Sequence, residues 1–323
     1  MKLVDLVEKI PRVDQGDRDF LLATLPRFER LEDRFREYLT ASLDRRIPLA
    51  LNALQSLPRT GWLRLLLDGE NRDVLASHGR EYYGLRWLPF EQALTGGESV
   101  LEHCAEAQEL GILLFPEVSS RQMLAELMKF HDISEAIVGD FTPFDGLSRE
   151  DKTRLELIAL EVLTAGRFEG DLLGLHIYNC LGIYEGRDVD WSNISNLMLN
   201  SIASEREQGR VKSHQIRFVS FLENLYREDV DLFELRKIAK EIDVLHLVSK
   251  TSRIMLDGVS KHPDQELKRL CLEFFDWAES KIKTERGKAF YLGMRDVERG
   301  SEASYPKFLA SVLIKTLSVP YER

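Results

Sequence analysis

The chain has 323 residues, of which 44% are hydrophobic and 30% charged, so it can bury a large core in one or two domains. No apolar run approaches the roughly 20 residues that a membrane span needs, and the acidic first segment does not suit a secretory signal. The net charge of −10 makes a nucleic-acid partner unexpected, because such surfaces are usually basic. The three cysteines are widely separated, which favours a reducing compartment, so we expect a cytoplasmic protein without a membrane partner.

Helical periodicity dominates the sequence. In residues 148–165, Ser148 can cap a helix, acidic residues follow in the first turn, and Gly166 follows the last periodic residues. Similar patterns predict helices at about 17–43, 119–138, 171–184, 191–206, 211–227, 230–256, 264–284 and 305–317. Alternating, strand-like runs are almost absent, and no glycine-rich nucleotide-binding loop or nucleophile elbow occurs. The chain is therefore predicted to be all-α.

Residues 63–97 differ from the rest of the chain. They combine glycines with several aromatic residues and show no clean period. We interpret them as an insertion into the helical core, with a structural role favoured over that of a substrate lid.

One predicted helix carries polar residues that handle protons or metals. His131 and Asp132 are adjacent, and Glu135 lies four residues beyond His131. On a continuous helix, at about 100° per residue, Glu135 would lie about 40° from His131 and about 60° from Asp132. Gly139 is expected to end the helix, which leaves Asp140 in a turn from which its carboxylate can face the same point.

An imidazole nitrogen beside a carboxylate oxygen is a sound start for a divalent metal site, provided that further ligands join it. Such an ion lowers the pKa of bound water and offsets charge on a phosphoryl oxygen, while a nearby carboxylate can manage protons. The alternative is a buried, hydrogen-bonded structural pair, which is the more common role of a histidine–aspartate dipeptide taken alone.

Three blocks, in order, carry a longer resemblance. They are PRTGW at Pro58–Trp62, ESVLEH at Glu98–His103 and HDISEAIVGDFTP at His131–Pro143. The sequence thereby resembles the HD-domain metal-dependent phosphohydrolases, specifically the branch of the 5′-deoxynucleotidases, whose last two blocks read ESVxEH and HDLAEAIVGDITP. The resemblance implies an HD-domain helical bundle, here with additional helices at both ends.

The resemblance implies a metal site of two histidines and two aspartates, and three of the ligands carry over as His103, His131 and Asp132. The fourth lies on a later helix, where Asp243 is favoured because residues 238–245 resemble the family's segment. Asp229 and Asp231 remain alternatives, at a predicted helix start where acidic residues are common anyway. The implied cofactor is one divalent transition metal ion, with Mn, Co, Fe, Zn and Ni all compatible.

The family's catalytic carboxylates fall on Glu135 and Asp140, which by resemblance orient the attacking water and handle the proton of the leaving group. Its substrate-binding arginine and tryptophan fall on Arg59 and Trp62. A guanidinium suits a phosphate, and an indole can pack on a sugar or base. The implied reaction removes the 5′-phosphate of a (deoxy)nucleoside monophosphate, so the expected partner is a small anionic phosphate ester, a nucleotide.

Family members are often shorter than this chain. We therefore expect an N-terminal helical extension at 1–50, an HD-type phosphohydrolase domain at 51–260 that includes the insertion, and a C-terminal helical extension at 261–323 packed on the core. The extra helices offer surface for partners or for a homodimer.

Two other functions remain open. A two-metal HD protein, such as a phosphodiesterase or a di-iron oxygenase, would use further histidines, for which His176 and His214 are candidates. A regulatory or scaffolding protein could instead keep the HD fold without catalysis. His246, one turn after Asp243, could face the site, with a supporting or core role favoured over that of a ligand.

Overall fold

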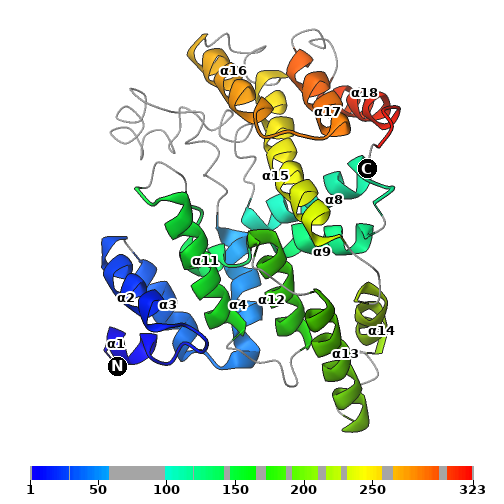
Figure 1. The fold of residues 1–323 in the computed structure, drawn as a ribbon. Helices are drawn as coiled ribbons and strands as arrows, with labels where there is room; N and C mark the ends of the chain where they lie inside the picture. Colours follow the sequence, from blue (N-terminus) through cyan, green and yellow to red (C-terminus); the bar gives the residue numbers. More distant parts are fainter. Residues whose placement is uncertain are drawn as a thin grey trace.

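The structure is a computed structural model that describes residues 2–28, 30–57, 99–118, 120–141, 146–164, 172–186, 191–209, 216–226, 231–256, 265–297 and 304–321. The regular elements within these ranges are helices, which confirms the all-α prediction (Figure 1). The predicted domain boundaries stay predictions. None of the described helices is long and apolar enough to cross a membrane.

The N-terminal residues form α1 (Leu3–Val7), α2 (Gln15–Thr24), the 3₁₀ helix η1 (Leu25–Arg27), α3 (Leu31–Thr40) and α4 (Leu43–Ser56). The single helix expected at 17–43 is thus divided. Pro26 occupies the 3₁₀ turn, and Arg30 adopts a left-handed conformation with φ 66°, which an α-helix cannot contain. Helices α2 and α3 pack against α11 (Arg149–Thr164), whose first turn is capped by Ser148 as predicted, at 3.0 Å from Asp151 N.

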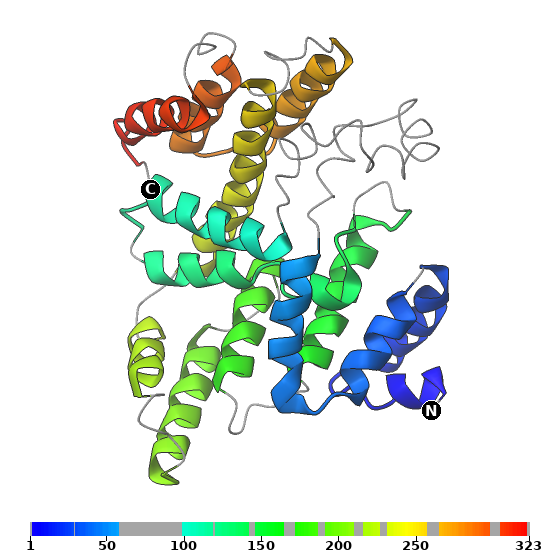
Figure 2. The same ribbon diagram turned by 180° about the vertical axis from the view of Figure 1, so that it is seen from behind.

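The centre of the molecule is built from α8 (Val100–Leu114), α9 (Arg121–Phe130), the short α10 (Glu135–Val138), α12 (Leu172–Glu185) and α15 (Leu232–Ile254). The long α15 contacts α8, α9 and α12 near its N-terminal end, and α16 (Gln265–Glu279) and α17 (Glu285–Arg295) near its C-terminal end (Figures 1 and 2). Helix α18 (Tyr305–Leu317) packs on α17 and α8, α13 (Trp191–Glu207) packs on α12, and α14 (Ile216–Leu225) packs on α13.

One hydrophobic core runs through the N-terminal, central and C-terminal helices. Leu21 of α2, Leu124 of α9 and Phe290 of α17 are each completely buried and belong to this same cluster. The helices at both ends therefore share a core with the central helices, and they frame the elements that carry the polar cluster described next.

Candidate metal centre

Ser99 and Glu102 fix the start of α8 and thereby the position of His103 one residue later. The Ser99 side chain accepts a hydrogen bond from Glu102 N, and the Glu102 carboxylate accepts one from Ser99 N at 2.7 Å. This capping box satisfies two backbone donors at the helix start. Two residues of the ESVLEH block thus have a structural role, and they bring His103 into the interior.

The helix expected at 119–138 ends at Phe130, and residues 131–134 form a turn before α10 begins at Glu135. In a continuous helix the Met128 carbonyl would accept the backbone N–H of Asp132. Here Nδ1 of His131 lies 2.7 Å from that carbonyl oxygen and donates to it. The expectation that one continuous helix carries His131, Asp132 and Glu135 is therefore wrong, and a side-chain hydrogen bond at the helix end replaces the regular pattern.

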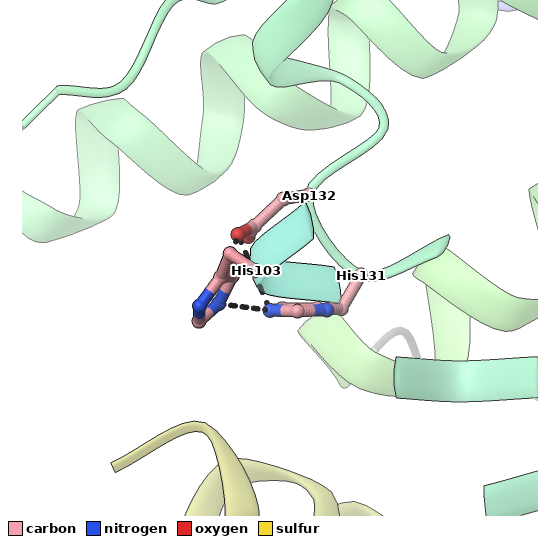
Figure 3. Close-up of side chains that lie close together, drawn as sticks. All are labelled: His103, His131 and Asp132. Atoms are coloured by element: carbon pink, nitrogen blue, oxygen red, sulfur yellow. Dashed lines mark hydrogen bonds and ion pairs between the residues drawn. The ribbon is translucent and has the colours of Figure 1, made fainter. Parts of the chain in front are cut away.

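Figure 3 shows His103, His131 and Asp132 converging on one point. Nε2 of His103 and Nε2 of His131 are 3.2 Å apart, and Oδ2 of Asp132 lies 3.2 Å from His131 Nε2 and 3.5 Å from His103 Nε2. All three side chains are buried. Because the His131 Nδ1–H faces a carbonyl, the lone pair of its Nε2 faces the cluster in the neutral ring.

Asp243, on α15, also reaches this cluster. Its Oδ1 lies 3.2 Å from His103 Nε2 and 3.7 Å from His131 Nε2, while its Oδ2 accepts a hydrogen bond from the Tyr184 hydroxyl at 3.1 Å. Asp231 instead caps α15 by accepting from Glu234 N, and Asp229 lies outside the described residues. Of the two described candidates for the fourth ligand, Asp243 is the one that reaches the cluster.

The donor atoms fit one divalent ion. Bonds of about 2.0–2.2 Å from a metal to nitrogen or oxygen place neighbouring ligand atoms about 3.0 Å apart in an octahedron and about 3.4 Å apart in a tetrahedron. The observed separations among the two imidazole nitrogens and the carboxylate oxygens are 3.2 to 3.7 Å, so they overlap the upper part of this range and extend about 0.3 Å beyond it. Two imidazoles with two carboxylates also suit a first-row divalent transition metal.

Electrostatics favour positive charge at the same point. Burial alone would lower the pKa of His131, but the charges of Asp132 and Cys104 and the hydrogen bonds to Asp132 and Asp243 raise it well above its usual value. Burial would likewise raise the pKa of Asp243, yet its hydrogen bonds with His103 and His131 hold it well below. The cluster therefore stabilises a cation, which a bound metal ion would supply.

Glu135, the first residue of α10, is completely buried beside a lysine that the sequence did not nominate. Nζ of Lys152, on α11, lies 3.2 Å from Glu135 Oε1 and 3.4 Å from Glu156 Oε1. Burial would lower the pKa of Lys152, but the carboxylates of Glu156, Glu135, Asp132 and Asp140 together raise it well above its usual value. Lys152 thus links the two predicted catalytic carboxylates electrostatically with the metal cluster.

The residues before and after Asp140 both contact the N-terminal part of the chain. Gly139 before it has φ 96° and ψ 163°, a conformation essentially restricted to glycine, and a Cβ there would lie 2.8 Å from Nη1 of Arg34. Phe141 after it packs edge-on against Phe28, with 4.8 Å between ring centroids. The N-terminal helices therefore contact the residues on either side of Asp140.

The remaining predicted residues fall into two groups. His176 is buried on α12, with Nε2 2.9 Å from Glu126 Oε2 and Nδ1 3.1 Å from the Tyr226 hydroxyl, so both ring nitrogens have protein partners. Those outside the described residues are His214, Arg59, Trp62 and the insertion at 63–97.

Comparison with known proteins matches residues 86–213 to the family model of the HD domain. The chain is therefore similar to HD-domain proteins over residues 86–213. It is 27% identical over 114 residues to a 5′-deoxynucleotidase of Schizosaccharomyces pombe, and 32% identical over 88 residues to a 5′-deoxynucleotidase of Xenopus laevis. These alignments cover 35% and 27% of this chain, and 44% and 43% of the relatives. No solved structure matches the chain significantly.

The matches confirm the resemblance to HD-domain proteins that the three sequence blocks carry. The HD domain match includes three candidate ligands, His103, His131 and Asp132, and both predicted catalytic carboxylates, Glu135 and Asp140, but it ends before Asp243. The packing of α15 against α8 brings Asp243 to the other three candidate ligands.

Proposed function

We propose that this protein is a metal-dependent phosphohydrolase that removes the 5′-phosphate of (deoxy)nucleoside monophosphates. The observation that carries the proposal is the convergence of His103, His131, Asp132 and Asp243 on one point, next to the buried carboxylate of Glu135 and its partner Lys152. The names of the two 5′-deoxynucleotidase relatives support the choice of substrate class.

The two histidines and two aspartates would hold one divalent ion, through Nε2 of each imidazole and one oxygen of each carboxylate. When bound, such an ion lowers the pKa of a coordinated water and offsets charge on a phosphoryl oxygen. Asp132 and Asp243 reduce the net charge of the loaded site. The hydroxyl of Tyr184 holds the second oxygen of Asp243 away from the histidines, which orients that carboxylate.

Hydrolysis forms a bond between a water oxygen and phosphorus and breaks the bond between phosphorus and the 5′ oxygen. Glu135 is the proposed acceptor of the water proton, and the Lys152 ammonium at 3.2 Å holds its carboxylate in place. Asp140 is the proposed group that manages the proton of the leaving oxygen. By resemblance, Arg59 would bind the phosphate and Trp62 would pack on the nucleoside.

The test is phosphate release from a panel of ribo- and deoxyribonucleoside monophosphates, with and without a chelator. We expect release that the chelator abolishes and that E135Q lowers by about 10²- to 10⁴-fold in kcat, the usual contribution of a general base. The matched control is E241Q, because Glu241 is also a buried carboxylate but accepts its hydrogen bonds from Lys283 and Thr284. Metal-loaded protein that releases phosphate from none of these compounds would contradict the proposal.

A further inference from the structure

His103 has a second buried contact, on the side of its ring that faces away from the cluster. Its Nδ1 lies 2.9 Å from Nδ1 of His246, on α15. His103 is 0% and His246 3% exposed, so water does not compete for this hydrogen bond. One of the two nitrogens must carry the proton and the other must accept it.

Glu106 decides which nitrogen donates. Its Oε2 lies 3.3 Å from Nε2 of His246 and 2.7 Å from Nζ of Lys250. An ionised carboxylate only accepts hydrogen bonds, so Nε2 of His246 carries a proton. A neutral imidazole has a single N–H, which leaves Nδ1 of His246 as an acceptor. His103 must then donate from its own Nδ1, and the lone pair of its Nε2 faces the cluster.

We propose that His246 and Glu106 are positioning residues that hold His103 in the tautomer able to bind the metal ion. This inference rests on the proposed function, because it assigns a role toward the same ion. Metal-binding histidines commonly donate their other N–H to a neighbouring acceptor, and removal of that acceptor lowers metal affinity by about 10- to 100-fold. Here the acceptor is a second imidazole, which a carboxylate in turn orients.

The helical geometry explains how two helices supply both the ligands and their support. On α8, Glu106 follows His103 by one turn, and on α15, His246 and Lys250 follow Asp243 on one face. Because α8 packs on α15, Nε2 of His103 faces Asp243. On the other side of the ring, Nδ1 of His103 faces His246, which also contacts Glu106. His246 is not an additional ligand, because it contacts the nitrogen that points away from the cluster.

The decisive variants are H246L, which removes the acceptor, and H246N, whose side-chain oxygen can take the place of Nδ1. The metal-free proteins would be titrated with Co²⁺, and its visible absorption would report binding. We expect H246L to raise the Kd for Co²⁺ by about 10- to 100-fold and H246N to recover most of that loss. The matched control is H176L, because His176 is another buried histidine paired with a glutamate, at 2.9 Å from Glu126. It should leave the Kd unchanged.

Nitrogen-15 spectra of histidine-labelled, metal-free wild-type protein test the tautomer without any metal. The inference predicts that His103 is protonated at Nδ1 and His246 at Nε2. Protonation of His103 at Nε2, an H246L variant with the wild-type Kd, or an H246N variant as weak as H246L would each overturn it. Wild-type protein that binds no metal would contradict the proposed function, and the tautomer would still be decided by the spectra.

Discussion

Nε2 of His103 and Oδ1 of Asp243 lie 3.2 Å apart, although the two residues stand on different helices, α8 and α15. The HD domain match ends at residue 213, so this pair joins a matched histidine to an aspartate beyond the match. The candidate metal centre therefore depends on the packing of α15 against α8, and changes in either helix should alter the affinity for the metal ion.

Lys152 should stabilise the fold through two buried carboxylates, those of Glu156 and Glu135. In K152M the buried Glu135 carboxylate loses its cation; because the Lys152 side chain is 27% exposed, the cost should be below the about 3 kcal/mol of a fully buried pair. The double variant K152M/E135Q removes the Glu135 charge as well and should recover part of that loss, while Glu156 stays without its lysine. Chemical denaturation of the four proteins at pH 7 gives the coupling free energy. Strictly additive effects of the two changes would show that the pair is not coupled.

Gly139 should tolerate no side chain. G139A places a Cβ 2.8 Å from Nη1 of Arg34 at φ 96°, so we expect a loss of roughly 1–3 kcal/mol in the free energy of unfolding and a lower kcat, because Asp140 is displaced. The matched control is G146A, at φ 74° but with nothing within 4 Å of the added Cβ. Equal losses of stability and activity in the two variants would argue against the contact with Arg34.

The Tyr184 hydroxyl should affect the metal affinity of the site rather than the stability of the fold. Y184F removes the hydroxyl that donates to Asp243 Oδ2 at 3.1 Å, so the Kd for Co²⁺ should rise by about tenfold with little change in Tm. Y178F is the control on the same helix, since that hydroxyl donates to Glu161. A rise in Kd of the same size in Y178F would mean that the effect is not specific to Asp243.

Glu106 should make stability depend on pH in acid. Burial would raise its pKa, but the hydrogen bonds from His246 and Lys250 and the charge of Lys250 outweigh burial and hold it at about 2, against an ordinary value of 4.5. Since the pKa is lower in the folded state, the resulting stability is fully present above about pH 4.5 and disappears as the pH falls toward about 2. The difference in unfolding free energy between wild type and E106Q should shrink across that range. A difference that is constant with pH would contradict this assignment.

The sequence blocks named the candidate metal ligands but not the residues packed around them. His103, His131 and Asp132 stand in blocks with specific spacing, so each could be named from sequence. Asp243 was favoured over Asp229 and Asp231 on a shorter likeness, because the position of the fourth ligand depends on how α15 packs. Lys152 was missed because lysine and glutamate four residues apart usually form an exposed helical pair, and Lys152 instead reaches the buried Glu135.

The helix that carries His103 was itself not predicted. The buried stripe of α8 has helical spacing, but several of its members are small or polar, which weakens the periodic signal: they are His103, Cys104, Ala107 and Gly111. Helices α4 and α17 were missed too, and α4 contains Pro48, which usually interrupts a helix. The break after Phe130 was also not predictable from periodicity, because it depends on the His131 ring reaching the Met128 carbonyl.

The central claim is a single metal ion held by two histidines and two aspartates, and metal analysis of purified, dialysed protein tests it most directly. We predict one divalent transition metal ion per chain in wild-type protein, loss of that ion in D132A and in D243A, and its retention in the E241Q control. Wild-type protein without bound metal, two ions per chain, or full retention by both aspartate variants would contradict the account.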